Sequence, residues 1–149
     1  SKTRTAVKVQ THVTLSMLNI HDLPNILSWC KHQYDTWNYE WDWGVHGYQN
    51  CLPHFNIVEN PSYLHMRNLP EKQKSIIYKM LDEQHEKFSN AQLPDWEQWA
   101  VDNIINLKNV ISQTPDQDGW RIFIDNTNAS DKFRNVSIHD YIPWVGEYF

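Results

Sequence analysis

The N-terminal part of the chain alternates between apolar and polar residues. Every second residue from Val7 to Met17 is Val, Thr, Leu or Met, and the residues between them are polar. A period of two is typical of a β-strand with one buried face. From Leu23 to Trp37 the apolar positions recur at helical spacing, and Pro24 is acceptable in a first helical turn. The pattern predicts a strand, a short turn at Asn19 to Asp22 with helix-capping side chains, and an amphipathic helix.

A second strand and a second helix are predicted further along the chain. Residues 38–50 are aromatic and contain glycine without a sustained period, which indicates a loop. The apolar run from Pro53 to Val58 predicts a strand, and Leu69-Pro70 predicts the start of a helix whose apolar stripe reaches Phe88. Two consecutive strand–helix units predict parallel strands joined by a right-handed crossover.

Helices are also predicted for the C-terminal part. Asp95 with Gln98, and Thr114 with Gln117, have the spacing of a capping box, and an apolar stripe follows the first of these pairs. The segment from Trp120 to Ile124 fits a helix and also a strand. The predicted fold class is α/β, with two strand–helix units followed by C-terminal helices.

Composition and charge narrow the classes of function. A chain of 149 residues suits one hydrophobic core. The net charge of -5 and the scattered Lys and Arg residues argue against nucleic acid as a partner. No apolar run is long enough to span a membrane, and Ser1 to Gln10 lacks the apolar centre of a signal peptide, so we expect no membrane partner and a cytoplasmic location. Because the sequence begins without Met and enters a strand-like run at once, we expect upstream residues to be missing.

Few residues form recognisable catalytic or metal-binding motifs. Cys30 and Cys51 lack the short spacing of zinc or iron–sulfur ligands and are predicted to be buried free thiols. None of the eight histidines has the one-turn spacing of a zinc hydrolase, and His85-Glu86 stands alone. The sequence also lacks a Gly-rich phosphate loop and a serine-hydrolase elbow. We therefore predict no catalytic residue and no metal site.

The predicted strands indicate where a ligand would lie. In a barrel of strand–helix units the helices pack outside, so the apolar face of residues 7–17 should face them, and His12, Thr14 and Ser16 should point into the interior. A polar interior suits a barrel that holds a ligand. In parallel α/β proteins the functional residues lie at the carboxyl ends of the strands, here Asn19 to Asp22 and Glu59 to Tyr63.

Three stretches of the chain resemble one protein family. They are Thr14 to Pro24 running into Trp29, then Glu59 to Leu64 with Leu69-Pro70 and Lys74, and finally Asp131 to Asn135 with Ile138 to Pro143. Their order and approximate spacing resemble those of the C-terminal half of radical SAM proteins of the twitch-domain type. The resemblance extends across most of the chain. The family's ending tends to carry Glu after Pro, whereas this chain has Pro143-Trp144.

The resemblance implies a fold, a cofactor and a partner. It implies that residues 1–88 form the end of a partial TIM-like (β/α) barrel, and that residues 89–149 form a twitch-like helical extension. The parent protein would use S-adenosylmethionine and a [4Fe-4S] cluster for radical chemistry on an unknown small-molecule or peptide substrate. The three closely spaced cysteines that hold the cluster are absent here. The missing N-terminal barrel half would therefore be the partner of this chain, and the isolated chain would be inactive.

The resemblance also implies residues of a site. Asp131 and Arg134, one helical turn apart, most simply form a structural ion pair. Four polar residues at the strand ends would contact the cofactor or the substrate. The alternative for each of the four is strand-end capping and turn formation. These residues are Ser16, Asn19, Asn60 and Ser62.

Two other hypotheses stay open at this point. In one, the chain is a non-catalytic α/β binding module whose aromatic connection 38–50, with Trp41 and Trp43, docks a protein or a peptide. In the other, the chain is a structural α/β protein without a ligand. Open sheet edges would favour self-association in either case.

Overall fold

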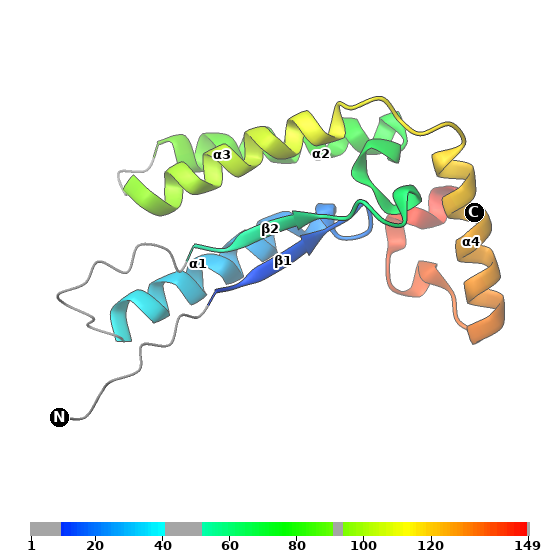
Figure 1. The fold of residues 1–149 in the computed structure, drawn as a ribbon, viewed down its shortest axis with the longest axis horizontal. Coiled ribbons are helices and arrows are strands. Elements are labelled where there is room, and N and C mark those ends of the chain that lie inside the picture. Colours follow the sequence, from blue (N-terminus) through cyan, green and yellow to red (C-terminus); the bar gives the residue numbers. More distant parts are fainter. Residues whose placement is uncertain (1–9, 41–51, 91–93, 149) are drawn as a thin grey trace.

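The computed structural model describes residues 10–40, 52–90 and 94–148 (Figure 1). In this part the chain is mixed α/β and mostly helical, with a small parallel sheet. In chain order the elements are β1 (His12–Leu15), η1 (Ile20–Asp22), α1 (Leu23–Glu40), β2 (His54–Ile57), η2 (Ser62–Leu64), η3 (Met66–Asn68), α2 (Glu71–Ser89), α3 (Pro94–Ile111), α4 (Gly119–Arg134), η4 (Ile138–Asp140) and η5 (Pro143–Tyr148).

The sheet of the described residues consists of two parallel strands. β1 pairs with β2 in register from His12 opposite His54 to Leu15 opposite Ile57. Each strand leads into a helix, α1 after β1 and α2 after β2, which confirms the two predicted strand–helix units and their parallel pairing. Residues 7–9 of the predicted first strand lie outside the described residues. Residues 38–40 belong to α1 and not to a loop, and the rest of the aromatic connection lies outside the described residues as well.

The two faces of the sheet differ in burial, as their alternating pattern predicts. Leu15 is fully buried, and the ring of Phe55 meets the ring of Trp99 on α3 with 5.0 Å between centroids. His12 and Thr14, on the opposite face, are exposed. Ser16 was predicted to share this polar face, and that prediction is wrong. Ser16 follows the strand and is buried in a turn.

One hydrophobic cluster joins the sheet to the helices. α1 runs alongside the two strands, and α2 and α3 lie side by side (Figure 1). An ion pair between Lys108 and Asp82 links α3 to α2. The cluster draws on both parts of the chain, so the division at residues 88 and 89 stays a prediction. Its members include Leu15, Leu23, Leu27, Ile77, Leu81, Ile104, Leu107, Phe123 and Val145.

The helices begin differently from the predicted capping boxes. α3 begins at Pro94, and the side chain of Gln98 donates to Asp102 at 2.8 Å instead of reaching back to a cap. α4 begins after Asp118, whose φ of 60° is left-handed, so Thr114 is not its cap. Proline fixes the backbone of a first helical turn without a side-chain cap, which explains the start of α3. Residues 120–124 lie within α4, so the strand alternative is wrong.

The C-terminal segment folds back toward the carboxyl end of the sheet. α4 ends at Arg134, and the next residue, Asn135, has a left-handed φ of 53°. Asp131 accepts a hydrogen bond from the backbone N–H of Ile138 at 2.7 Å. Within the described residues it forms no ion pair with Arg134, so the predicted pair is absent there. The return brings the Trp144 ring to 4.6 Å from the ring of His21. No helix in the described part is long and apolar enough to cross a membrane.

Neighbouring isoleucines on α2 test this packing. Ile77 is fully buried in the cluster, whereas Ile76 is 48% exposed. We expect Ile77→Ala to lower the free energy of unfolding by about 2–5 kcal/mol, because it removes buried methyl groups and leaves a cavity. Ile76→Ala is the matched control and should change it by less than about 0.5 kcal/mol. Urea unfolding of both variants measures the difference, and equal losses would contradict the described burial.

Candidate functional site

The loops that follow the two strands lie together at one end of the sheet. The backbone N–H of Met17 donates to the carbonyl of Leu64 at 3.1 Å, and the N–H of Val58 donates to the carbonyl of Leu15 at 2.9 Å. Parallel strands carry their carboxyl ends to the same edge, and this is where parallel α/β proteins place their functional residues. The prediction that these two loops share one end of the sheet is therefore confirmed.

The first loop is organised by Asn19. Its amide oxygen accepts from the N–H of Ser16 at 2.8 Å, and its amide nitrogen donates to the carbonyl of Thr14 at 2.9 Å. The Ser16 hydroxyl accepts from the N–H of Leu18 at 3.2 Å. The structure thus brings Ser16 and Asn19 together and engages the amide of Asn19 within the loop. This is the strand-end capping role, and contact of either residue with a cofactor stays a prediction.

The geometry of Asn19 resembles the pairing of a strand. The carbonyls of Thr11 and Leu15 face β2, so the backbone groups of Thr14 and Ser16 point toward the opposite edge of β1. In a parallel sheet, the N–H and the carbonyl of a single residue on a neighbouring strand would bond these same two groups. The side chain of Asn19 therefore covers the last part of this edge.

The second loop places Asn60 and Ser62 apart from the first pair. Both are exposed, and Asn60 makes no side-chain hydrogen bond with any described residue. The carbonyl of Ser62 accepts from the side chain of Asn68 at 2.8 Å, so Ser62 belongs to a different group of polar contacts. Of the four predicted site residues, only Ser16 and Asn19 are joined to each other by a hydrogen bond within the described part of the chain.

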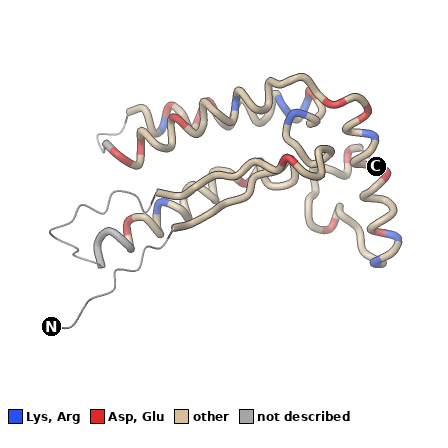
Figure 2. The backbone as a smooth tube through the Cα atoms, in the orientation of Figure 1, with Lys and Arg blue, Asp and Glu red and all other residues tan. Residues whose placement is uncertain are grey.

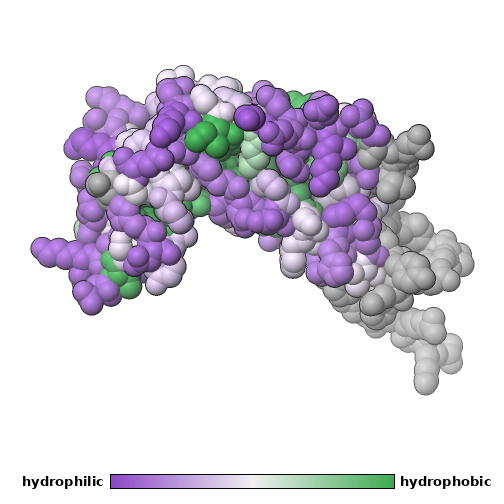
Figure 3. All heavy atoms as spheres, turned by 180° about the vertical axis from the view of Figure 1, so that it is seen from behind, coloured by the Kyte–Doolittle hydropathy of each residue, from purple (hydrophilic) through white to green (hydrophobic). Residues whose placement is uncertain are grey.

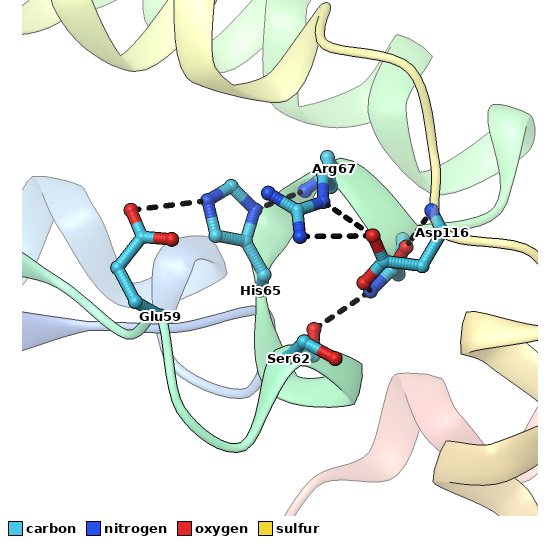
Figure 4. A network of polar contacts seen from close by, with 6 residues as sticks. Glu59, Ser62, His65, Arg67 and Asp116 are labelled. Carbon is cyan, nitrogen blue, oxygen red and sulfur yellow. Dashed lines mark hydrogen bonds and ion pairs between the residues drawn. The ribbon is translucent and has the colours of Figure 1, made fainter.

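A polar network, which we call the loop network, ties the second loop to the connection between α3 and α4 (Figure 4). Asn68 is buried and lies at its centre. Its amide nitrogen donates to Asp116 Oδ2 at 3.1 Å, and its oxygen accepts from the N–H of Asp116 at 2.8 Å. The Arg67 guanidinium pairs with Asp116 Oδ1 at 2.8 Å. The members of the loop network are Glu59, Ser62, His65, Arg67, Asn68 and Asp116.

Glycine is required where this network meets α4. A Cβ atom on Gly119 would lie 2.6 Å from the amide carbon and oxygen of Asn68. Gly119 is itself buried at the first turn of α4. The close approach of helix backbone to a buried amide explains why no larger residue fits there.

His65 is the buried titratable group of the loop network. Its Nδ1 accepts from the N–H of Arg67 at 3.1 Å, so the neutral ring carries its proton on Nε2, which lies 3.7 Å from Glu59 Oε1. Burial lowers the pKa of His65, and the charge of Arg67 lowers it further, against the opposing effect of Glu59. The imidazole is therefore neutral at neutral pH.

Asp116 carries the negative charge that pairs with Arg67 in the loop network. Its hydrogen bond with Asn68 is the main cause that lowers its pKa, and Arg67 and Ser62 add to the effect. Asp116 is thus ionised at neutral pH and forms an ion pair with the charged Arg67. With Asn68 and Arg67 fixing the loop from inside, the side chains of Glu59, Asn60 and Ser62 remain exposed at the carboxyl end of the sheet. The arrangement holds a polar loop in place and supplies hydrogen-bonding groups, but no activated nucleophile.

His21 connects the first loop to α2 and the C-terminal segment. Its Nε2 lies 2.9 Å from the side-chain oxygen of Gln73, and the nitrogen of Gln73 donates to the hydroxyl of Tyr148 at 3.3 Å. Lys72 forms an ion pair with Glu147 beside this contact. Burial lowers the pKa of His21, against the effect of Gln73.

The sequence analysis missed the residues that organise these contacts. Apart from His12 on the polar strand face, it considered histidines only as short-spaced metal ligands, and it assigned no role to Asn68 or Asp116. The one usable signal was position, since His65 and Asn68 follow the strand end that was predicted to be functional.

Removal of Asn68 tests the loop network. We expect Asn68→Ala to lower the free energy of unfolding by about 2–4 kcal/mol, because it leaves buried backbone and carboxylate groups without their partners. Asn106, exposed on α3, gives a matched Asn→Ala control that should change stability by less than about 0.5 kcal/mol. Urea unfolding compares them. Equal stability of the two variants would mean that the network does not hold the loop.

The lowered pKa values of His65 and His21 predict a pH dependence of stability. A histidine whose pKa is lower in the folded state takes up its proton more readily when unfolded, so stability falls as the pH drops below about 6.5 and continues to fall until the folded pKa is reached. His65→Gln should make this slope shallower, while His32→Gln, at an exposed position, should leave it unchanged. Urea unfolding between pH 7 and 5 measures the slope. An unchanged slope in His65→Gln would mean that another group causes the pH dependence of stability.

Neither metal-ligand geometry nor similarity to known proteins indicates a function for the strand-end loops. Within residues 10–40, 52–90 and 94–148, no group of three or more His, Cys, Asp or Glu side chains is placed to hold a metal ion. The chain matches no protein-family model, no curated protein and no solved structure.

Proposed function

We propose that this chain supplies the last strand–helix units and the closing helices of a radical SAM protein with a partial (β/α) barrel. The observation that carries the proposal is the parallel pair β1–β2, each strand followed by a helix, with both strand-end loops at one end. The three motifs that resemble the twitch-domain type fall on these parts. Thr14 to Pro24 covers the first loop, Glu59 to Lys74 covers the second, and Asp131 to Pro143 covers the C-terminal return.

The uncovered face of the sheet supports a barrel arrangement. Parallel sheets are normally covered on both faces. Here the apolar face packs against helices, while His12, Thr14 and His54 on the other face are exposed. In a barrel that face would line a ligand cavity, enclosed by the strands of the N-terminal barrel half.

The surface of the described residues gives less support to other partners. Lys and Arg are interspersed with Asp and Glu along α2, α3 and α4 (Figure 2), whereas nucleic-acid binding needs a clustered positive field. The face seen in Figure 3 is largely hydrophilic, with small separate apolar areas. A small-molecule or peptide ligand at the strand ends is therefore the better proposal.

The residues of this chain do not fit the iron–sulfur cluster. The resemblance implies three closely spaced cysteine ligands, and the chain has two cysteines. Cys30, on α1, is fully buried, and burial raises its pKa to about 11, so its thiolate is disfavoured. Cys51 lies outside the described residues. The proposal therefore assigns the cluster to the N-terminal barrel half.

The strand ends fit part of the S-adenosylmethionine site. S-Adenosylmethionine supplies the radical chemistry of the family when it is bound together with the cluster. Asn60 is exposed at the strand end and can hydrogen-bond its amino, carboxylate or hydroxyl groups. Ser62 is also exposed, but its side chain hydrogen-bonds Asp116. Asn19 fits less well, because its amide is engaged with Thr14 and Ser16. In this proposal Asn68 and Asp116 act by positioning the loop that carries Asn60 and Ser62.

The complete open reading frame that contains this sequence tests the proposal. We expect it to encode Cys-x-x-x-Cys-x-x-Cys upstream of Ser1, and the protein purified without oxygen to show iron–sulfur absorbance and to release 5′-deoxyadenosine from S-adenosylmethionine. Asn60→Ala should weaken cofactor binding about fivefold, the loss of one hydrogen bond, and Asn128→Ala, at an exposed position on α4, should not. A reading frame without the three cysteines would refute the proposal.

A further inference from the structure

The register of the sheet places two histidines side by side. His12 and His54 begin β1 and β2 and are directly opposite one another. Their ring centroids are 5.4 Å apart, with an angle of 57° between the ring planes. Both side chains are exposed on the uncovered polar face. Because successive residues of a strand point to opposite faces, the two imidazoles necessarily share that face.

The separation of the two rings suits a shared metal ion. A metal ion bound to one nitrogen of each ring at about 2.0–2.1 Å puts the ring centroids roughly 4.5–6 Å apart. The observed 5.4 Å lies in this range. Exposed imidazole side chains can also turn about their own bonds without disturbing the backbone pairing. The pair therefore needs no rearrangement of the strands to ligate one ion.

Neither ring is bound to another side chain within the described residues. Among the described residues, His12 and His54 form no hydrogen bond or ion pair, in contrast to His21 and His65, whose ring nitrogens bond Gln73 and Arg67. Thr14 and Asn56 form the next register pair on the same face. Water or these polar side chains can complete the coordination of an ion held by two imidazoles.

We propose that His12 and His54 together form a binding site for a divalent ion that prefers imidazole ligands, of the class of Zn²⁺. Imidazole nitrogen suits Zn²⁺, Cu²⁺ and Ni²⁺ rather than Mg²⁺ or Ca²⁺. Two protein ligands leave coordination positions open to water, so the site is an open one. The site requires only the β1–β2 register, and it does not depend on the proposed radical SAM function.

Titration of the intact chain with Zn²⁺ tests the site. In a chain labelled with ¹⁵N-histidine, the first equivalent should shift the ring resonances of His12 and His54 and of no other histidine. In calorimetry, His12→Gln and His54→Gln should each weaken Zn²⁺ binding on the order of 100-fold, because the second imidazole acts as an intramolecular ligand. His32→Gln, at an exposed position on α1, is the matched control and should leave the affinity unchanged.

A second variant separates loss of a ligand from loss of the fold. His12→Cys retains a side chain that ligates zinc and should bind Zn²⁺ more tightly than His12→Gln. Circular dichroism and the melting temperature of each variant report whether the fold is retained. Unchanged affinity in His12→Gln or in His54→Gln, or first shifts at other histidines, would overturn the proposal. A reading frame that lacks the cluster cysteines would leave it standing.

Discussion

The in-register parallel pairing of β1 with β2 is the constraint on which the rest of the structure depends. It brings the two strand-end loops to one end of the sheet. It also places the even-numbered residues of both strands on one face and the odd-numbered residues on the other. The strands are only four residues long, and a two-stranded sheet is marginal by itself. Its stability must therefore come from Leu15, Phe55 and their neighbours, which pack the apolar face against the helices. Packing on one face thus fixes the geometry of the polar face.

A second constraint fixes the loop after β2. Asn68 uses one buried amide to bond the loop through Ser62 and the α3–α4 connection through Asp116. Gly119 lets α4 begin directly against that amide. The loop network thereby couples the second strand end to the helix that follows α3. Its buried members orient the backbone, and the exposed Asn60 remains free to meet a ligand.

Sequence patterns predicted what is local and missed what is distant. The alternation before Met17 and the helical stripes after Leu23 and Pro70 gave the right elements, because burial of one face imposes a period along the chain. The capping boxes at Asp95 and Thr114 were wrong. Proline and a left-handed Asp118 start those helices instead, and spacing alone cannot distinguish these ways of starting a helix. Contacts such as Asn68 with Asp116 leave no periodic signal.

The four predicted site residues show why residue type alone cannot assign a ligand contact. Asn19 and Asn60 follow strands in the same way and have the same hydrogen-bonding groups. In the structure, Asn19 has used its groups to cover the edge of β1, whereas the side chain of Asn60 is exposed and makes no hydrogen bond with a described residue. A polar side chain can bind a ligand only with groups that the fold leaves available. The same reasoning applies to the histidines. His21 and His65 are engaged by their neighbours, whereas the pairing of distant strands brings His12 and His54 together with ring nitrogens that bond no described residue.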